Sequence, residues 1–120
     1  MIKMVFLLKR KAGMSREEFI RKYESGHAKL GEKHVPDAAH YVRRYLMPVP
    51  ELFTGSAPEP EYDVITELWF DTREQYDLAM ARLARPDVVA EIVADEETIF
   101  DRSKHRVFLV EEHESPVRVS

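Results

Sequence analysis

The segment from Tyr62 to Phe70 is apolar on both of its alternating sides, and this pattern limits the folds open to the chain. Most of its residues are Val, Ile, Thr or aromatic types, which favour β-strands. One side would carry Val64, Thr66, Leu68 and Phe70, and the other Ile65, Glu67 and Trp69. A strand with one face in water would not be apolar on both sides. The segment therefore predicts a strand whose sheet is covered on both faces.

Three other segments predict strands because they are short, largely apolar and rich in β-branched or aromatic residues. They are residues 2–8, 40–46 and 104–111. Residues 47–61 contain four of the seven prolines and predict a long loop between the second and third strands. Long loops in compact domains are often functional lids or rims.

A capping box predicts the start of the first helix. The Ser15 side chain can accept a hydrogen bond from the amide of Glu18, whose own side chain reaches back. The face that follows at helical spacing consists of Phe19, Tyr23, His27 (or Gly26) and Leu30. The helix is expected to end before Pro36.

Two more helices are predicted between the third and the last strand. Asp71 or Thr72 can cap the first of them, which is expected to end near Arg85. Pro86 then opens a short helix, since proline suits the first helical position. The apolar face of this short helix consists of Val88, Val89, Ile92 and Val93.

The predicted order is β-α-β-β-α-β with an extra helix before the last strand, which is the split βαβ pattern of ferredoxin-like folds. We therefore expect one α+β domain over residues 1–120, with an antiparallel sheet, the helices on one of its faces and a polar tail at 113–120. A second copy packed sheet to sheet is the natural cover for the other face. The chain is thus expected to form a homodimer.

Composition restricts the function further. The chain has 120 residues and a formal net charge of −4, without the basic stripe of a nucleic-acid binder, so we expect no nucleic-acid partner. It contains no cysteine, which excludes disulfides and thiolate chemistry. The apolar run at residues 2–8 is too short to cross a bilayer and lacks the layout of a signal peptide. We expect a cytoplasmic protein that does not associate with membranes.

An ordered set of motifs resembles the EthD-like branch of the dimeric α/β-barrel superfamily. The motifs are Lys-Arg-Lys-Ala-Gly-Met-Ser-Arg-Glu-Glu-Phe (9–19), Tyr-Glu-Ser-Gly-His-Ala-Lys-Leu (23–30), Pro36, Tyr41, Glu-Leu-Trp-Phe (67–70) and Asp-Thr-Arg-Glu-Gln-Tyr (71–76). The similarity runs over residues 2–112. It implies a homodimer in which two sheets close one barrel, with a pocket between sheet and helices.

Members of that family include cofactor-independent isomerases of the methylmuconolactone methylisomerase type, along with polyketide cyclases and dehydratases. Others have no assigned chemistry. In the isomerase-like members, the residues that match His27 and Tyr41 lie in the pocket. The loop that matches residues 47–61 varies within the family, so the resemblance does not identify the substrate.

His27 and Tyr41 are the candidate catalytic residues. An imidazole can give or take a proton near neutral pH, and a tyrosine hydroxyl both donates and accepts hydrogen bonds. Tyr23 and Phe19 share the helix face of His27 and are expected to contact the substrate. The alternative for these residues is a structural role, with their polar atoms satisfied inside the core.

The roles of Glu67 and Trp69 depend on which strand face lines the pocket, because a shift of one residue reverses every side chain. On the pocket side, Glu67 would act as a general base or orient His27, and Trp69 would form a wall for a flat ring. On the dimer side, Glu67 would pair with an arginine such as Arg43. Both residues are retained as candidate substrate-binding residues.

The histidines do not show the spacing of a metal site. No HxxxH or HExxH motif occurs, and His27 and His34 would lie roughly 10 Å apart along a helix, too far to share one ion. We therefore expect neither a metal nor another cofactor.

Together these features predict a cofactor-independent acid–base enzyme that acts on a small cyclic or aromatic carbonyl compound. The reaction would be an isomerisation, cyclisation, dehydration or related lyase step. One alternative is a non-catalytic small-molecule-binding or accessory protein of an oxidative degradation system. Another is a cofactor-free or haem-dependent monooxygenase.

Overall fold

The computed structural model describes residues 1–118, so the last two residues of the predicted tail lie outside the described part. The elements, in chain order, are β1 (Ile2–Leu8), α1 (Arg16–Lys22), the π-helical segment η1 (Tyr23–His27), α2 (Ala28–His34), β2 (His40–Tyr45), β3 (Val64–Phe70), α3 (Arg73–Leu83), α4 (Pro86–Ile99), the single-turn 3-10 helix η2 (Arg102–Lys104) and β4 (Arg106–Leu109).

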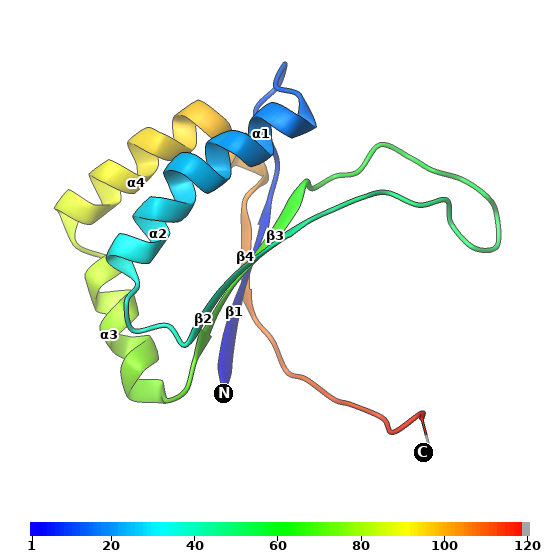
Figure 1. Ribbon diagram of the computed structural model, residues 1–120. Helices are drawn as coiled ribbons and strands as arrows, with labels where there is room; N and C mark the ends of the chain where they lie inside the picture. The colour runs from blue at the N-terminus through cyan, green and yellow to red at the C-terminus, as the bar shows by residue number, and fades with distance from the viewer. Residues whose placement is uncertain (119–120) are drawn as a thin grey trace.

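The four strands form one antiparallel sheet in the order β2-β3-β1-β4. The helices all lie on one side of it (Figure 1). In the two central strands, β1 and β3, Phe6 is opposite Thr66 and Leu8 is opposite Val64. The predicted ferredoxin-like α+β architecture is confirmed.

The helices begin where the capping patterns predict. The Ser15 hydroxyl accepts a hydrogen bond from the amide of Glu18, 3.2 Å away. Of the two candidate caps for α3, the structure uses Thr72, whose hydroxyl accepts from the amide of Gln75. Pro86 occupies the first turn of α4, as expected.

Two predicted lengths were wrong. The helix that begins at Pro86 is not short: α4 has 14 residues and continues through an acidic stretch to Ile99. The last strand is shorter than residues 104–111: it begins only at Arg106, after a 3-10 turn at residues 102–104, and it ends at Leu109. The Asp101 side chain caps this turn by accepting from the amide of Ser103.

The core lies between the helices and the sheet, in two clusters of buried side chains. The first cluster contains Leu8, Phe19, Tyr23, Ala28, Val64, Ile99 and Phe100. The second contains Val35, Leu68, Phe70 and Ala79. The alternate residues of β3 from Val64 to Phe70 are therefore buried on the helix side of the sheet.

The opposite side of the sheet carries a second set of side chains, which we call the outer face. Strand alternation and register assign to it Lys3, Val5, Leu7, His40, Val42, Arg44, Ile65, Glu67, Trp69, Arg106 and Phe108. Its apolar members remain partly exposed, and Phe108 is 49 % exposed. The outer face is thus an apolar surface, with charged residues among its members, that the chain's own helices do not cover.

The loop predicted at residues 47–61 forms an arm that leaves the sheet between β2 and β3 and extends away from the helices (Figure 1). The Glu51 carboxylate closes its tip by accepting from the amides of Phe53 and Thr54. Gly55 supplies the positive φ of 71° that this turn requires. Leu52 and Phe53, at the tip, are 89 % and 92 % exposed.

Candidate functional site

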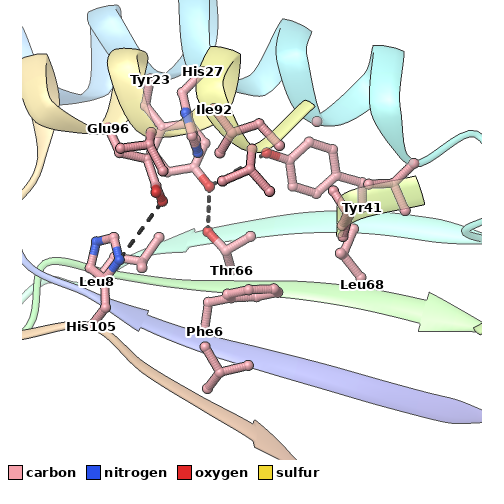
Figure 2. A pocket seen from close by; sticks show the side chains of 16 residues that line it. Phe6, Leu8, Tyr23, His27, Tyr41, Thr66, Leu68, Ile92, Glu96 and His105 are labelled. Carbon is pink, nitrogen blue, oxygen red and sulfur yellow. Dashed lines mark hydrogen bonds and ion pairs between the residues drawn. The ribbon is translucent and has the colours of Figure 1, made fainter. Parts of the chain in front are cut away.

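A cavity of about 340 Å³ lies between the helix layer and the sheet (Figure 2). Its lining consists of Phe6, Leu8, Tyr23, His27, Gly31, Val35, Tyr41, Thr66, Leu68, Leu83, Val89, Ile92, Val93, Glu96, His105 and Val107. Val89 and Val107 are nearly half exposed, so the cavity is open to solvent beside them. Its volume is at the lower end of the range for small-molecule sites, and its mainly apolar walls with a few polar groups are typical of such sites.

A π-helical segment places two of the predicted residues in this cavity. Over Tyr23–His27 the helix widens, and the amide of Ala28 donates to the carbonyl of Tyr23, five residues earlier. The wider turn brings the Tyr23 and His27 rings edge to face, with their centroids 5.3 Å apart. Such segments are frequent at functional sites. The helical spacing in the sequence predicted the shared face but not the widened turn.

His27 is held in a fixed orientation by α4. Its Nδ1 atom lies 2.8 Å from a carboxylate oxygen of Asp95, and its side chain is 12 % exposed. The Phe100 ring packs edge-on against the imidazole, with centroids 5.1 Å apart. When Nδ1 carries the proton, it donates a hydrogen bond to the Asp95 carboxylate, which leaves Nε2 as the nitrogen for a ligand. Sequence reasoning did not identify Asp95.

Three hydroxyl groups lie together beside His27. The Tyr23 hydroxyl is 2.6 Å from the hydroxyl of Thr66 on β3 and 3.5 Å from the hydroxyl of Tyr41 on β2. Burial raises the pKa of both tyrosines, so they stay neutral and can donate hydrogen bonds. Tyr41 fits because α2 has Gly31 at the contact: a Cβ there would lie 2.5 Å from the Tyr41 ring.

A second acid–imidazole pair, Glu96 and His105, lines the same cavity, and sequence reasoning missed both residues. Their carboxylate oxygen and Nδ1 atom are 3.7 Å apart. Burial raises the pKa of the Glu96 carboxyl and lowers the pKa of the His105 imidazole. Both shifts favour the neutral forms.

The signal for these two residues was present in the sequence. Glu96 lies seven residues after Val89 and four after Ile92, and so continues the apolar face of α4. His105 lies two residues before Val107, and both residues line the cavity from the same side of the sheet.

Three predicted substrate-binding residues do not line the cavity. Phe19 is 1 % exposed and belongs to the core beneath it, packed against Tyr23. Glu67 and Trp69 lie on the outer face, because β3 turns Thr66 and Leu68 toward the helices. The sequence left open which side of the sheet Glu67 and Trp69 occupy. Their position on the outer face excludes both residues from this cavity.

Glu67 forms the ion pair expected for the dimer side, but its partner is Arg44, the residue after Arg43. Glu67 accepts from Nε of Arg44 at 2.8 Å and from the indole of Trp69 at 2.8 Å. Arg43 was the wrong choice, since its side chain lies on the helix side, where it binds Glu24 through two nitrogens. The two arginines are adjacent in β2 and therefore point to opposite faces.

The described residues, 1–118, contain no cluster of three or more His, Asp or Glu side chains placed to hold a metal ion. Within that same range, no helix has the length and apolar character needed to cross a bilayer.

Several solved structures are similar to this chain. The protein At3g17210 of Arabidopsis thaliana has a TM-score of 0.62 and 20 % identity, with 98 % of this chain and 100 % of that chain covered. A dimeric ferredoxin-like protein of Thermobifida fusca has a TM-score of 0.56 and 14 % identity, over 91 % of this chain and 88 % of that one. At such identities these likenesses establish the fold alone.

A third structure comes from an ethyl tert-butyl ether D (EthD) family protein of Bacillus halodurans, with a TM-score of 0.61 and 17 % identity over 94 % of this chain and 100 % of that chain. No curated protein matches the sequence. The family model of the EthD domain matches residues 11–103, which is most of the chain. The chain therefore belongs to the EthD family.

Proposed function

We propose that the protein is a cofactor-independent acid–base enzyme that acts on a small cyclic or aromatic carbonyl compound. The observation that carries this proposal is the His27–Asp95 pair at the edge of an apolar cavity. A carboxylate on Nδ1 fixes the tautomer of a histidine and stabilises its protonated form during proton transfer. In this arrangement, Nε2 of His27 is the base.

Tyr41 is the proposed hydrogen-bond donor to the substrate carbonyl. Its hydroxyl lines the cavity, and its raised pKa keeps it protonated at neutral pH. Hydrogen bonding to the carbonyl oxygen stabilises the negative charge that develops there when a neighbouring carbon loses its proton. Tyr23 helps to position Tyr41, because its hydroxyl lies within hydrogen-bond distance of the Tyr41 hydroxyl and is itself bonded to Thr66.

The substrate proposed for this cavity is uncharged. Among its lining residues, all within the described part of the chain, there is no lysine or arginine. Carboxylate and phosphate ligands are usually bound by such cations, and an unpaired anion in apolar surroundings is costly. The apolar walls fit the carbon skeleton of a ring, and the polar groups on one side fit its carbonyl.

The test follows exchange of the protons adjacent to the carbonyl in D₂O by ¹H NMR, over a panel of cyclic ketones, aryl ketones and lactones. Wild-type protein is expected to accelerate exchange for at least one probe, and His27→Ala to abolish the acceleration. If wild-type protein binds a probe tightly without promoting exchange, the non-catalytic binding or accessory role replaces the proposed enzyme.

We also propose that the protein works as a homodimer through its outer face. This surface combines apolar residues such as Val5, Leu7 and Ile65 with the charged pair of Glu67 and Arg44. The structures from Thermobifida fusca and Bacteroides fragilis are described as dimeric proteins with this fold. The arm at residues 47–61 extends on the same side and would contact a second copy (Figure 1).

A further inference from the structure

Two consecutive acidic residues near the end of α4 face different surroundings. Asp95 binds Nδ1 of His27 and is not part of the cavity lining, whereas Glu96 lines the cavity. Consecutive helical residues are rotated by about 100° from each other, so the two side chains point in different directions. Asp95 orients His27, and nothing in the proposed reaction so far uses Glu96.

The Glu96 carboxyl is enclosed, with 16 % of its side chain exposed. Four titratable or charged groups surround it: His27 from η1, Asp95 from its own helix, Arg102 from η2 and His105 ahead of β4. Arg102 approaches to 3.5 Å and His105 to 3.7 Å. Burial is the largest influence, and it raises the pKa of Glu96 despite the nearby guanidinium of Arg102.

Within the described part of the chain, the ring of the neighbouring His105 has one unpaired nitrogen. Its Nε2 atom is buried and has no hydrogen-bond partner among residues 1–118. Leaving such an atom unpaired in the folded protein costs about 1–3 kcal/mol. Figure 2 shows Glu96 and His105 directed toward each other from the helix layer and the sheet, beside His27 and Tyr23.

We infer that Glu96 is a second catalytic residue of this cavity, a general acid that delivers a proton to substrate carbon while His27 removes one. This inference rests on the proposed function and narrows it to an isomerase that moves a carbon–carbon double bond in an unsaturated cyclic ketone. Two groups suit this reaction because the carbon that loses a proton differs from the carbon that gains one, so one group can serve each carbon.

The reaction balances without an added oxidant, reductant or co-substrate. Nε2 of His27 takes a proton from the carbon between the carbonyl and the double bond, and the C–H electron pair forms a dienolate. The far carbon of the dienolate then takes the proton of the Glu96 carboxyl, so that a C–H bond forms as the O–H bond breaks. His27 is left protonated and Glu96 ionised, and proton exchange with solvent restores both.

The experiment uses a β,γ-unsaturated cyclohexenone and two readouts on the same samples. Formation of the conjugated ketone is followed by ultraviolet absorbance, and exchange at the carbon adjacent to the carbonyl is followed by NMR in D₂O. Glu96→Gln keeps the size of the side chain but cannot supply the proton. We expect it to slow isomerisation by about 100-fold or more, while the exchange, which needs only His27 and Tyr41, continues near the wild-type rate.

The matched control is Glu97→Gln, which changes the next residue of the same helix, an exposed side chain. It is expected to leave both readouts unchanged, and circular dichroism checks that each variant is folded. If Glu96→Gln isomerises the ketone as fast as wild type, this inference is overturned while the proposed function stands. If wild type promotes neither reaction, or His27→Ala promotes both as well as wild type, the proposed function fails and this inference fails with it.

Discussion

The two faces of the sheet are made from the same strands but differ in how their polar residues are satisfied. On the helix side, Thr66 is 4 % exposed and bonds to the neutral hydroxyl of Tyr23. On the outer face, the next residue of β3, Glu67, is ionised and bound by Arg44. Arg44 holds the pKa of Glu67 below its usual range, whereas burial raises the pKa of Glu96 in the cavity.

Under the proposed function, the helix side carries the chemistry and the outer face carries the dimer contact. Proton transfer near neutral pH is favoured by a carboxyl whose pKa is raised, and on the helix side burial raises the pKa of Glu96, which lines the same cavity as His27. A carboxylate with a lowered pKa that is already paired is a poor proton donor or base. The outer face offers apolar area and fixed charge pairs, which serve recognition between proteins.

The largest expected effect is a difference in exchange rate between two variants, His27→Ala on the helix side and Glu67→Gln on the outer face. His27→Ala removes the proposed base and should lower the exchange rate by roughly 10²–10⁴-fold, the usual contribution of general acid–base catalysis. Glu67→Gln should change it by less than about twofold, as expected of a substitution away from the site. NMR exchange in D₂O measures both. A loss in Glu67→Gln equal to that in His27→Ala would mean that the outer face takes part in the chemistry.

The second prediction concerns association. Ile65→Glu places a charge in the middle strands of the outer face, where a second copy would have to desolvate it. We expect the dimer dissociation constant to rise about 100-fold or more, which corresponds to about 3 kcal/mol. Sedimentation equilibrium measures the change. Leu78→Glu is the control, because Leu78 is 52 % exposed on α3 in the helix layer; an unaltered dimer in Ile65→Glu would locate the interface elsewhere.

A third prediction tests how tightly the cavity side is packed. In Gly31→Ala the new methyl group would lie 2.5 Å from the Tyr41 ring, which must move. Overpacking of this kind typically costs about 1–3 kcal/mol, and here it should also weaken probe binding. In Gly26→Ala the nearest atom is 3.9 Å away, on Asp95, so the helix should gain about 0.5–1 kcal/mol. Urea unfolding compares the two; equal stabilities would show that Tyr41 adjusts freely.

The sequence predicted the helices and strands better than it predicted which side chains line the cavity. Capping patterns at Ser15 and Thr72 are local, so the helix starts could be located without tertiary information. The faces of β3 could be separated by alternation, but which face meets the helices depends on the packing of the whole sheet. That is why Glu67 and Trp69 were predicted as cavity residues and lie outside it.

The missed residues share another cause. Asp95 and Glu96 belong to a run of acidic residues, Asp95-Glu96-Glu97, that resembles a solvated helix face. Their contacts form only when α4 packs against η1, which brings Asp95 to His27. His105 precedes β4 and gains its partner only when η2 and β4 bring it near α4. Such contacts between distant segments leave no local pattern in a single sequence.

The smallest expected effect is a difference in the sign of pH dependence between the two faces. Glu96 has a raised pKa when folded, so the folded state holds more protons than the unfolded state once the unfolded pKa is passed. Its contribution to the free energy of unfolding is therefore fully present below the unfolded pKa and declines as pH rises through the folded pKa. Glu67 has a lowered pKa, so its contribution is present above the unfolded pKa and is lost as pH falls through the folded pKa.

Urea unfolding across the acidic range should thus show opposite changes in Glu96→Gln and Glu67→Gln. In Glu96→Gln, the free energy of unfolding should decline less than in wild type as pH rises toward neutral. In Glu67→Gln, it should increase less than in wild type as pH rises from the acidic end. Each difference is taken against wild type at the same protein concentration, since association also contributes to stability. Glutamine does not titrate, so each variant removes the pH dependence of one carboxyl. If both variants changed the dependence of unfolding free energy on pH in the same direction, the proposed contrast between the two faces would be wrong.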